Sequence, residues 1–125
     1  MQEAYRQGEI LFIKVALSAE AVKAIKEHSR AIEGGVIREG ETTGHKHVVN
    51  GGVLQTLETR HMGYMLGEGI HEYINLPEGE MFLSSDDKIT ITHPEHKELT
   101  LDKGAYVVRI QREYDEADKY RRVSD

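Results

Sequence analysis

Short runs of strand-forming residues, separated by turn signals about every ten residues, most limit what this chain can fold into. Residues 10–15, ILFIKV, are apolar on both faces of the expected strand, which is typical of a sheet interior. Further strands are expected at residues 36–37, 45–49, 53–58, 70–76, 81–83, 89–93, 98–101 and 105–111, the last three as a meander, with a loop at 59–69. This pattern predicts a mainly β (α+β) fold, a small β-barrel or sandwich of about 7–9 short strands.

One segment has a helical period instead. In residues 18–32, Val22, Ile25 and Ile32 fall on one face, while the charged side chains point elsewhere. Ser18 suits the N-cap position, and the glycines at 34–35 are expected to end the helix. We therefore expect one N-terminal amphipathic helix of about three to four turns.

Length, charge and hydropathy exclude several classes of protein. A chain of 125 residues fits a single domain, residues 1–125, with a charged C-terminal tail at 115–125 that forms a short helix or a partly ordered extension. The net charge of −6 argues against a nucleic-acid coat or a membrane-surface binder. The apolar run at 10–13 is too short to cross a bilayer, and no secretion signal is visible at the N-terminus. We expect a cytoplasmic protein.

Histidine is the chemical signal of this sequence, which has seven histidines and no cysteine. His45 and His47 lie two residues apart in an expected strand, so both imidazoles project from the same face and Lys46 from the other. A second pair, His93 and His96, lies around a proline turn, with His93 on the core-facing side of its strand. Without thiolates, a metal site here would have nitrogen and oxygen ligands only.

The predicted site combines these residues with a carboxylate. Its candidate metal ligands are His45, His47, His93, His96 and Glu58 or Glu41. Such a set suits Zn²⁺, Mn²⁺, Fe²⁺ or Ni²⁺. For hydrolysis, the candidate catalytic residues are His45, His47 and Glu41. His61 is a further candidate, whereas His28 is expected to be solvated and His71 to pack against Tyr73.

The sequence Asn50-Gly51-Gly52 is the strongest hairpin signal in the chain. If the loop is Gly51-Gly52, His45 lies opposite Glu58. If it is Asn50-Gly51, His47 lies opposite Leu54 and His45 does not face Glu58. The sequence leaves both registers open.

Two other functions are consistent with the same residues. In a metal-independent phosphodiesterase or ribonuclease, His45 and His47 would act as general acid and base. Lys46, Arg38 or Arg60 would then stabilise the developing charge. In a non-enzymatic assembly module, a mixed-charge strand edge at residues 109–113 would meet its copy in a homodimer. The substrate of either enzyme would be a small molecule or a phosphodiester.

Two resemblances arise at these motifs. Residues 40–47 (Gly-Glu-x-Thr-Gly-His-x-His), 93–96 (His-x-x-His) and 111–114 (Gln-Arg-Glu-Tyr) are similar to a pattern in small prokaryotic and viral proteins of unknown function. The His-x-His at His45 and His47 also resembles the first cupin motif, which implies a β-barrel with a metal-binding His-x-His. The spacing departs from that motif, since Gly40 is one residue too close and Glu58 too far downstream.

Overall fold

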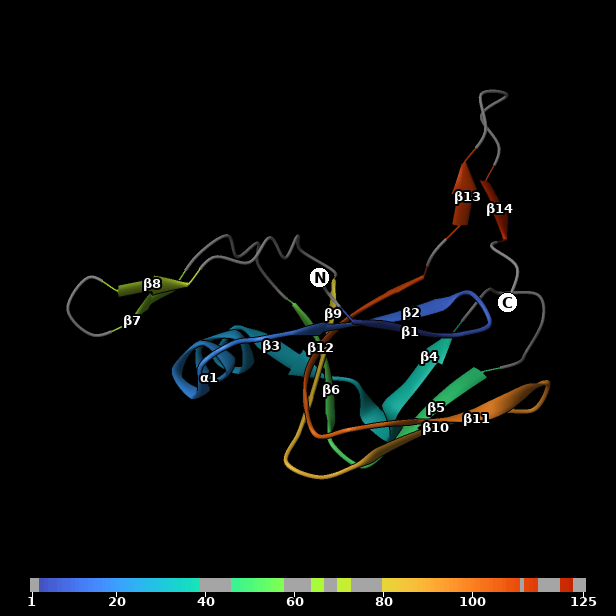
Figure 1. Ribbon diagram of the computed structural model, residues 1–125, viewed down its shortest axis with the longest axis horizontal. Helices are drawn as coiled ribbons and strands as arrows, with labels where there is room; N and C mark the ends of the chain where they lie inside the picture. The colour runs from blue at the N-terminus through green and yellow to red at the C-terminus, as the bar shows by residue number, and fades with distance from the viewer. Residues whose placement is uncertain are drawn as a thin grey trace.

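The computed structural model describes residues 3–38, 46–57, 64–66, 70–72, 80–110, 112–114 and 120–122. Over these residues the fold is mainly β with a single α-helix, as the sequence predicts. Its centre consists of a six-stranded and a four-stranded sheet, both antiparallel, packed as a sandwich (Figure 1). No helix in the described part of the chain is long and apolar enough to cross a membrane.

The six-stranded sheet has the order β1-β2-β12-β9-β6-β3. In that order its strands are β1 (Ala4–Gln7), β2 (Ile10–Val15), β12 (Gly104–Ile110), β9 (Met81–Ser85), β6 (Val53–Leu57) and β3 (Ser29–Ala31). The four-stranded sheet has the order β11-β10-β5-β4. Its strands are β11 (His96–Leu101), β10 (Ile89–His93), β5 (Lys46–Asn50) and β4 (Val36–Arg38).

Two short ribbons complete the described strands. They are β7 (Tyr64–Leu66) with β8 (Ile70–Glu72), and β13 (Arg112–Tyr114) with β14 (Tyr120–Arg122). β7 lies inside the segment expected to be a loop, and β14 pairs with β13 where a helix or an extension was expected. The described residues therefore contain fourteen strands, more than the sequence predicts, because pairs of three-residue strands leave too short a pattern to recognise.

The six-stranded sheet separates two apolar clusters. One face of this sheet meets the four-stranded sheet. The cluster between the two sheets includes Phe12 and Tyr106 from the six-stranded sheet and Ile91 from the four-stranded one. The opposite face carries α1 (Ala19–Glu27), whose buried Ile25 belongs to the second cluster together with Phe82 and Val107. The alternation of Tyr106 and Val107 along one strand shows how period-two side chains serve both layers. Each such fully buried side chain contributes about 1.5–3 kcal/mol.

The helix is shorter than expected. Ser18 caps its N-terminus by accepting the Ala21 N–H, as predicted, but α1 ends at Glu27 instead of residue 32. The hydroxyl of Ser29 donates to the Ile25 carbonyl, and the chain then enters β3, which pairs with β6. Backbone pairing at the edge of the sheet overrides the helical period of the sequence.

The predicted hairpin at residues 50–52 is wrong. β5 belongs to the four-stranded sheet and β6 to the six-stranded one, so the two strands do not pair and neither predicted register exists. Gly51 and Gly52 have φ of 86° and 84°. A Cβ on Gly51 would lie 2.9 Å from the Lys88 carbonyl oxygen, and one on Gly52 would lie 2.8 Å from that of Ser84. The glycines thus let the chain change sheets in close contact with β9 and β10.

The chain changes sheets twice more beside this point, between β9 and β10 and between β11 and β12 (Figure 1). The expected meander is therefore confirmed only for the β10–β11 hairpin. β12 lies between β2 and β9, but its pairing with β9 ends at Val108, so Arg109 and Ile110 pair only with β2 and the expected strand edge at residues 109–113 stays a prediction. Arg109 forms a salt bridge of 2.8 Å with Glu80 of the same chain.

We expect Gly52→Ala to destabilise the fold by about 2 kcal/mol or more, because a positive φ and a backbone contact both oppose a Cβ there. Gly34→Ala is the matched control. Gly34 has φ of 72°, but its Cβ would meet only a Val36 methyl at 3.6 Å, so about 1 kcal/mol is expected. Urea unfolding of both variants measures the difference. Equal losses would contradict a close passage between the sheets.

Tyr106 predicts a weakness at alkaline pH. Its hydroxyl donates to the Asp102 carbonyl oxygen at 2.7 Å, and burial raises its pKa above the usual 10.0, with smaller contributions from Tyr5 and Asp102. The neutral phenol stabilises the fold below about pH 10, and this stability is lost as pH rises through the raised pKa. Tyr106→Phe should lose about 1 kcal/mol at pH 7 but flatten the decline above pH 10. Denaturant unfolding across that pH range tests this, and an unchanged slope would contradict it.

Candidate functional site

Three histidines meet on the inner face of the four-stranded sheet. His96, His93 and His47 lie on the adjacent strands β11, β10 and β5. Ring centroids are 4.3 Å apart for His47 and His93, 4.5 Å for His93 and His96, and 5.9 Å for His47 and His96. His47 is 0% exposed, His93 is 8% exposed, and His96 is partly buried. We call these three residues the histidine cluster.

A β-bulge brings the third ring into the cluster. Ile91 pairs with Leu99, but the register then shifts and His93 pairs with His96. Without the shift, Lys97 would lie opposite His93, since a one-residue slip turns every side chain to the other face of the sheet. The irregular residue therefore decides whether a histidine or a lysine faces His93.

Gln7, at the end of β1, holds His47 from the opposite sheet. Its side-chain Nε2 donates to the carbonyl oxygens of Ile91 at 2.9 Å and Lys97 at 2.8 Å. Its Oε1 must then accept, and it lies 2.7 Å from Nδ1 of His47. We assign the proton of His47 to Nδ1 on this basis, so that in the neutral ring Nε2 carries the lone pair.

His93 is assigned the opposite tautomer. Its Nδ1 accepts the backbone N–H of Glu95 at 3.0 Å in the turn after β10. The proton of the neutral ring is therefore on Nε2. Two neighbouring imidazoles thus present an acceptor nitrogen on His47 and a donor nitrogen on His93.

The turn between β1 and β2 lies directly against the cluster. Gly8 has φ of 61°, and a Cβ there would lie 2.7 Å from Nε2 of His96 and 3.2 Å from Cε1 of His47. Only glycine lets the backbone approach the rings so closely. Glu9, the next residue of this turn, is also buried. The turn therefore covers the histidines and brings a buried carboxylate into the same part of the fold.

The structure places the predicted site residues only in part. His47, His93 and His96 come together, and Lys46 is exposed on the other face of β5, as the strand period predicts. His45, Glu41 and Glu58 lie outside the described residues, as do His61 and Arg60. Arg38 and His71 lie in β4 and β8, and His28 is exposed at the end of α1. Within the described ranges, no group of three or more potential ligands is arranged to hold a metal ion.

Sequence reasoning missed Gln7 and Gly8. The segment Tyr5-Arg6-Gln7-Gly8-Glu9 alternates no apolar residues and predicts no strand. The one available signal was a glutamine directly before a glycine that precedes the strongly apolar β2. Such a signal does not reveal that the amide reaches a histidine forty residues later.

A neutral imidazole can transfer a proton or coordinate a metal ion through its lone pair. In His47 that lone pair is on Nε2, and the Nδ1–H bond to Gln7 fixes the orientation of the ring. His93 is set up differently. A neutral imidazole bound through Nε2 carries its proton on Nδ1, which would break the bond from the Glu95 N–H.

Comparisons with known proteins give one family. The profile of a family described as "Domain of unknown function (DUF8820)" matches residues 6–111. No curated protein and no solved structure matches the chain.

The Gln7 contacts predict a contrast between two buried glutamines. Gln7→Met should destabilise the fold by about 2–4 kcal/mol, because three partners lose their hydrogen bonds inside the protein. Gln55→Met is the matched control, because Gln55 is also buried and its Oε1 has no hydrogen-bond partner among the described residues. We expect a change within about 1 kcal/mol there. Thermal and urea unfolding compare them, and equal effects would show that the Gln7 network contributes little.

Proposed function

Because the chain belongs to the family described as Domain of unknown function (DUF8820), which assigns no activity, we propose its function from the histidine cluster. We propose that the protein binds a divalent transition-metal ion, with His47 and His96 as ligands. The observation that carries this proposal is the Gln7–His47 hydrogen bond. This hydrogen bond leaves the lone pair of the buried imidazole on Nε2, which is the nitrogen that would bind the ion.

The spacing of the rings sets what a shared ion requires. Two imidazoles that bind one metal at about 2.0–2.1 Å have centroids about 4.5 Å apart at a right angle and about 5.2 Å apart in a tetrahedral site. The His47–His96 separation of 5.9 Å is larger than both values, and the two shorter separations, 4.3 and 4.5 Å, both involve His93. Ion binding would therefore require the partly buried His96 ring to move toward His47.

His93 is proposed as a neighbour that positions the ligands, since the Glu95 N–H occupies its Nδ1. Further ligands would come from residues outside the described ranges, with His45, Glu41 and Glu58 as the candidates from the sequence. A chain without cysteine has nitrogen and oxygen donors to offer, which suits Zn²⁺, Mn²⁺, Fe²⁺ or Ni²⁺. Hydrolysis would need one coordination position left open for water.

A second candidate function rests on the opposite tautomers of His47 and His93. An acceptor nitrogen beside a donor nitrogen is the arrangement of a general base and a general acid, as in a metal-independent phosphodiesterase. The pair proposed from the structure is then His47 with His93, in place of His45 with His47. Activity that survives EDTA would favour this candidate over the metal site.

Metal content of untagged protein tests the main proposal. We expect about one equivalent of bound ion after supplementation with Zn²⁺ or Ni²⁺, and a loss of affinity of about tenfold to hundredfold in His47→Asn and His96→Asn. His28→Asn is the matched control, because His28 is exposed at the end of α1. Less than about a tenth of an equivalent in the folded wild type, or equal affinity in all three variants, would overturn the proposal.

A further inference from the structure

A groove lies at the other side of the six-stranded sheet, where α1 begins and the chain leaves β9 for β10. Its volume is about 610 Å³, within the range of small-molecule sites. Its apolar wall comes from β2, α1, β6 and β12, with Val15, Leu17, Val22, Val53 and Ala105. The polar lining is Lys26, Ser84, Ser85, Asp86 and Asp87. No residue of the histidine cluster lines it.

Ser84 is the feature of this groove that points to a ligand. The residue is 8% exposed, and its buried Oγ has no hydrogen-bond partner among the described residues. On the sheet it lies between Val53 and Ala105, neither of which has a polar side chain. A buried hydroxyl without a partner is costly, and nothing in the packing of an apolar groove requires a serine there.

Gly52 lies close to β9 at the edge of the groove. A Cβ at position 52 would lie 2.8 Å from the Ser84 carbonyl oxygen and 2.8 Å from the Cβ of Ser85. Any other residue would therefore force this part of the lining to shift. Gly52 thus belongs to the groove lining as well as to the change of sheet.

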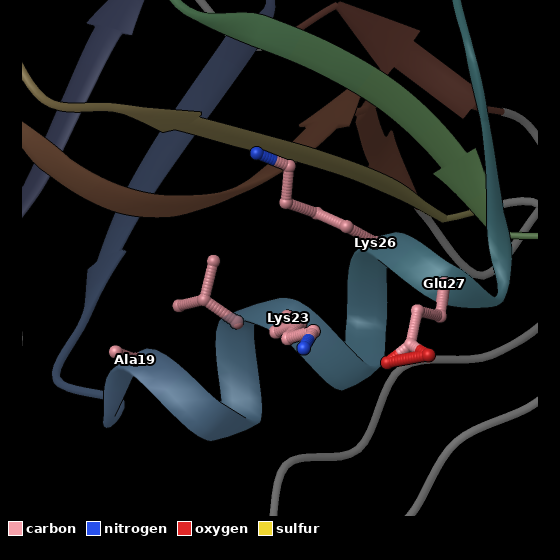
Figure 2. Close-up of a pocket in the computed structure, with 5 residues that line it drawn as sticks. Ala19, Lys23, Lys26 and Glu27 are labelled. Carbon is pink, nitrogen blue, oxygen red and sulfur yellow. The ribbon is translucent and has the colours of Figure 1, made fainter.

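Charge at the groove favours a cation. Asp86 and Asp87 lie at the turn after β9, where the Asp87 carboxylate accepts the Lys88 N–H at 2.7 Å and the Asp87 N–H donates to Ser85 Oγ at 3.1 Å. Among the described residues that line the groove, Lys26 is the single cation, and its side chain extends from α1 toward the strands (Figure 2). The two carboxylates outnumber it, so the lining carries a net negative charge.

A smaller pocket on the outer side of α1, drawn in Figure 2, lacks these features. It is lined by Ala19, Val22, Lys23, Lys26 and Glu27. None of these residues is a buried polar one. Of the two, the larger groove therefore combines a buried hydroxyl with a negatively charged lining.

We propose that the larger groove binds a small organic cation, a primary amine on a compact apolar body. The ammonium group donates to Ser84 Oγ in the negative field of Asp86 and Asp87, and the apolar body covers Val15, Leu17 and Val22. This site is separate from the histidine cluster, so it stands whether or not the protein binds a metal.

Three probes with the same body isolate the charge: phenethylamine, phenethyl alcohol and hydrocinnamate. Titrations are followed by calorimetry and by backbone amide shifts of the folded wild type. We expect phenethylamine to bind best, with shifts centred on β9 and the start of α1, and to weaken as salt is added. Ser84→Ala should weaken amine binding about fivefold to tenfold without lowering the melting temperature, since no internal hydrogen bond is lost.

The double variant Asp86→Asn with Asp87→Asn should abolish the preference for the amine over the alcohol. Glu98→Gln is the matched control, because Glu98 is exposed on β11 of the other sheet and should leave all affinities unchanged. The proposal is overturned if no probe binds, if the three probes bind equally, or if Ser84→Ala leaves the amine affinity unchanged in a folded protein.

Discussion

The amide of Gln7 joins the two sheets at the end where the histidines lie. One side chain from β1 donates to carbonyl groups of β10 and β11 and accepts from His47 of β5. Because the bonds to Ile91 and His47 are buried, their groups would be costly to leave without a partner. This contact therefore fixes the position of the β1–β2 turn, the tautomer of His47 and the cover that Gly8 forms over the rings. The proposed site depends on it more than on any pair of histidines.

Backbone irregularities do as much as side chains to build both sites. The bulge after Ile91 turns His96 toward His93, and the positive φ of Gly52 lets the chain pass close to the Ser84 carbonyl oxygen. At the bulge, a departure from regular pairing places a histidine where a regular strand would place Lys97. The two sites lie on opposite faces of the six-stranded sheet. Each is built on polar residues that lie beside an apolar cluster without belonging to it.

The positions of His47 and His93 were predictable, because side chains alternate between the two faces of a strand. A period of two places His47 inside and Lys46 outside, and it turns His93 toward the core with Ile91. The place of His96 was not predictable, because it depends on a one-residue shift that leaves no trace in local composition. The hairpin at Gly51 and Gly52 was wrong for a related reason: two glycines at positive φ suit a tight turn and a change of sheet equally well.

By itself the sequence determined the mainly β class, the N-cap of the helix, strand β2 and the face from which His47 and His93 project. These are local properties, set by side-chain period and capping chemistry within a few residues. Only the tertiary structure decided that β5 and β6 belong to different sheets, that the helix yields to β3 at Ser29, and that Gln7 reaches His47. Those outcomes depend on backbone pairing and buried hydrogen bonds between segments far apart in the chain, which no local pattern encodes.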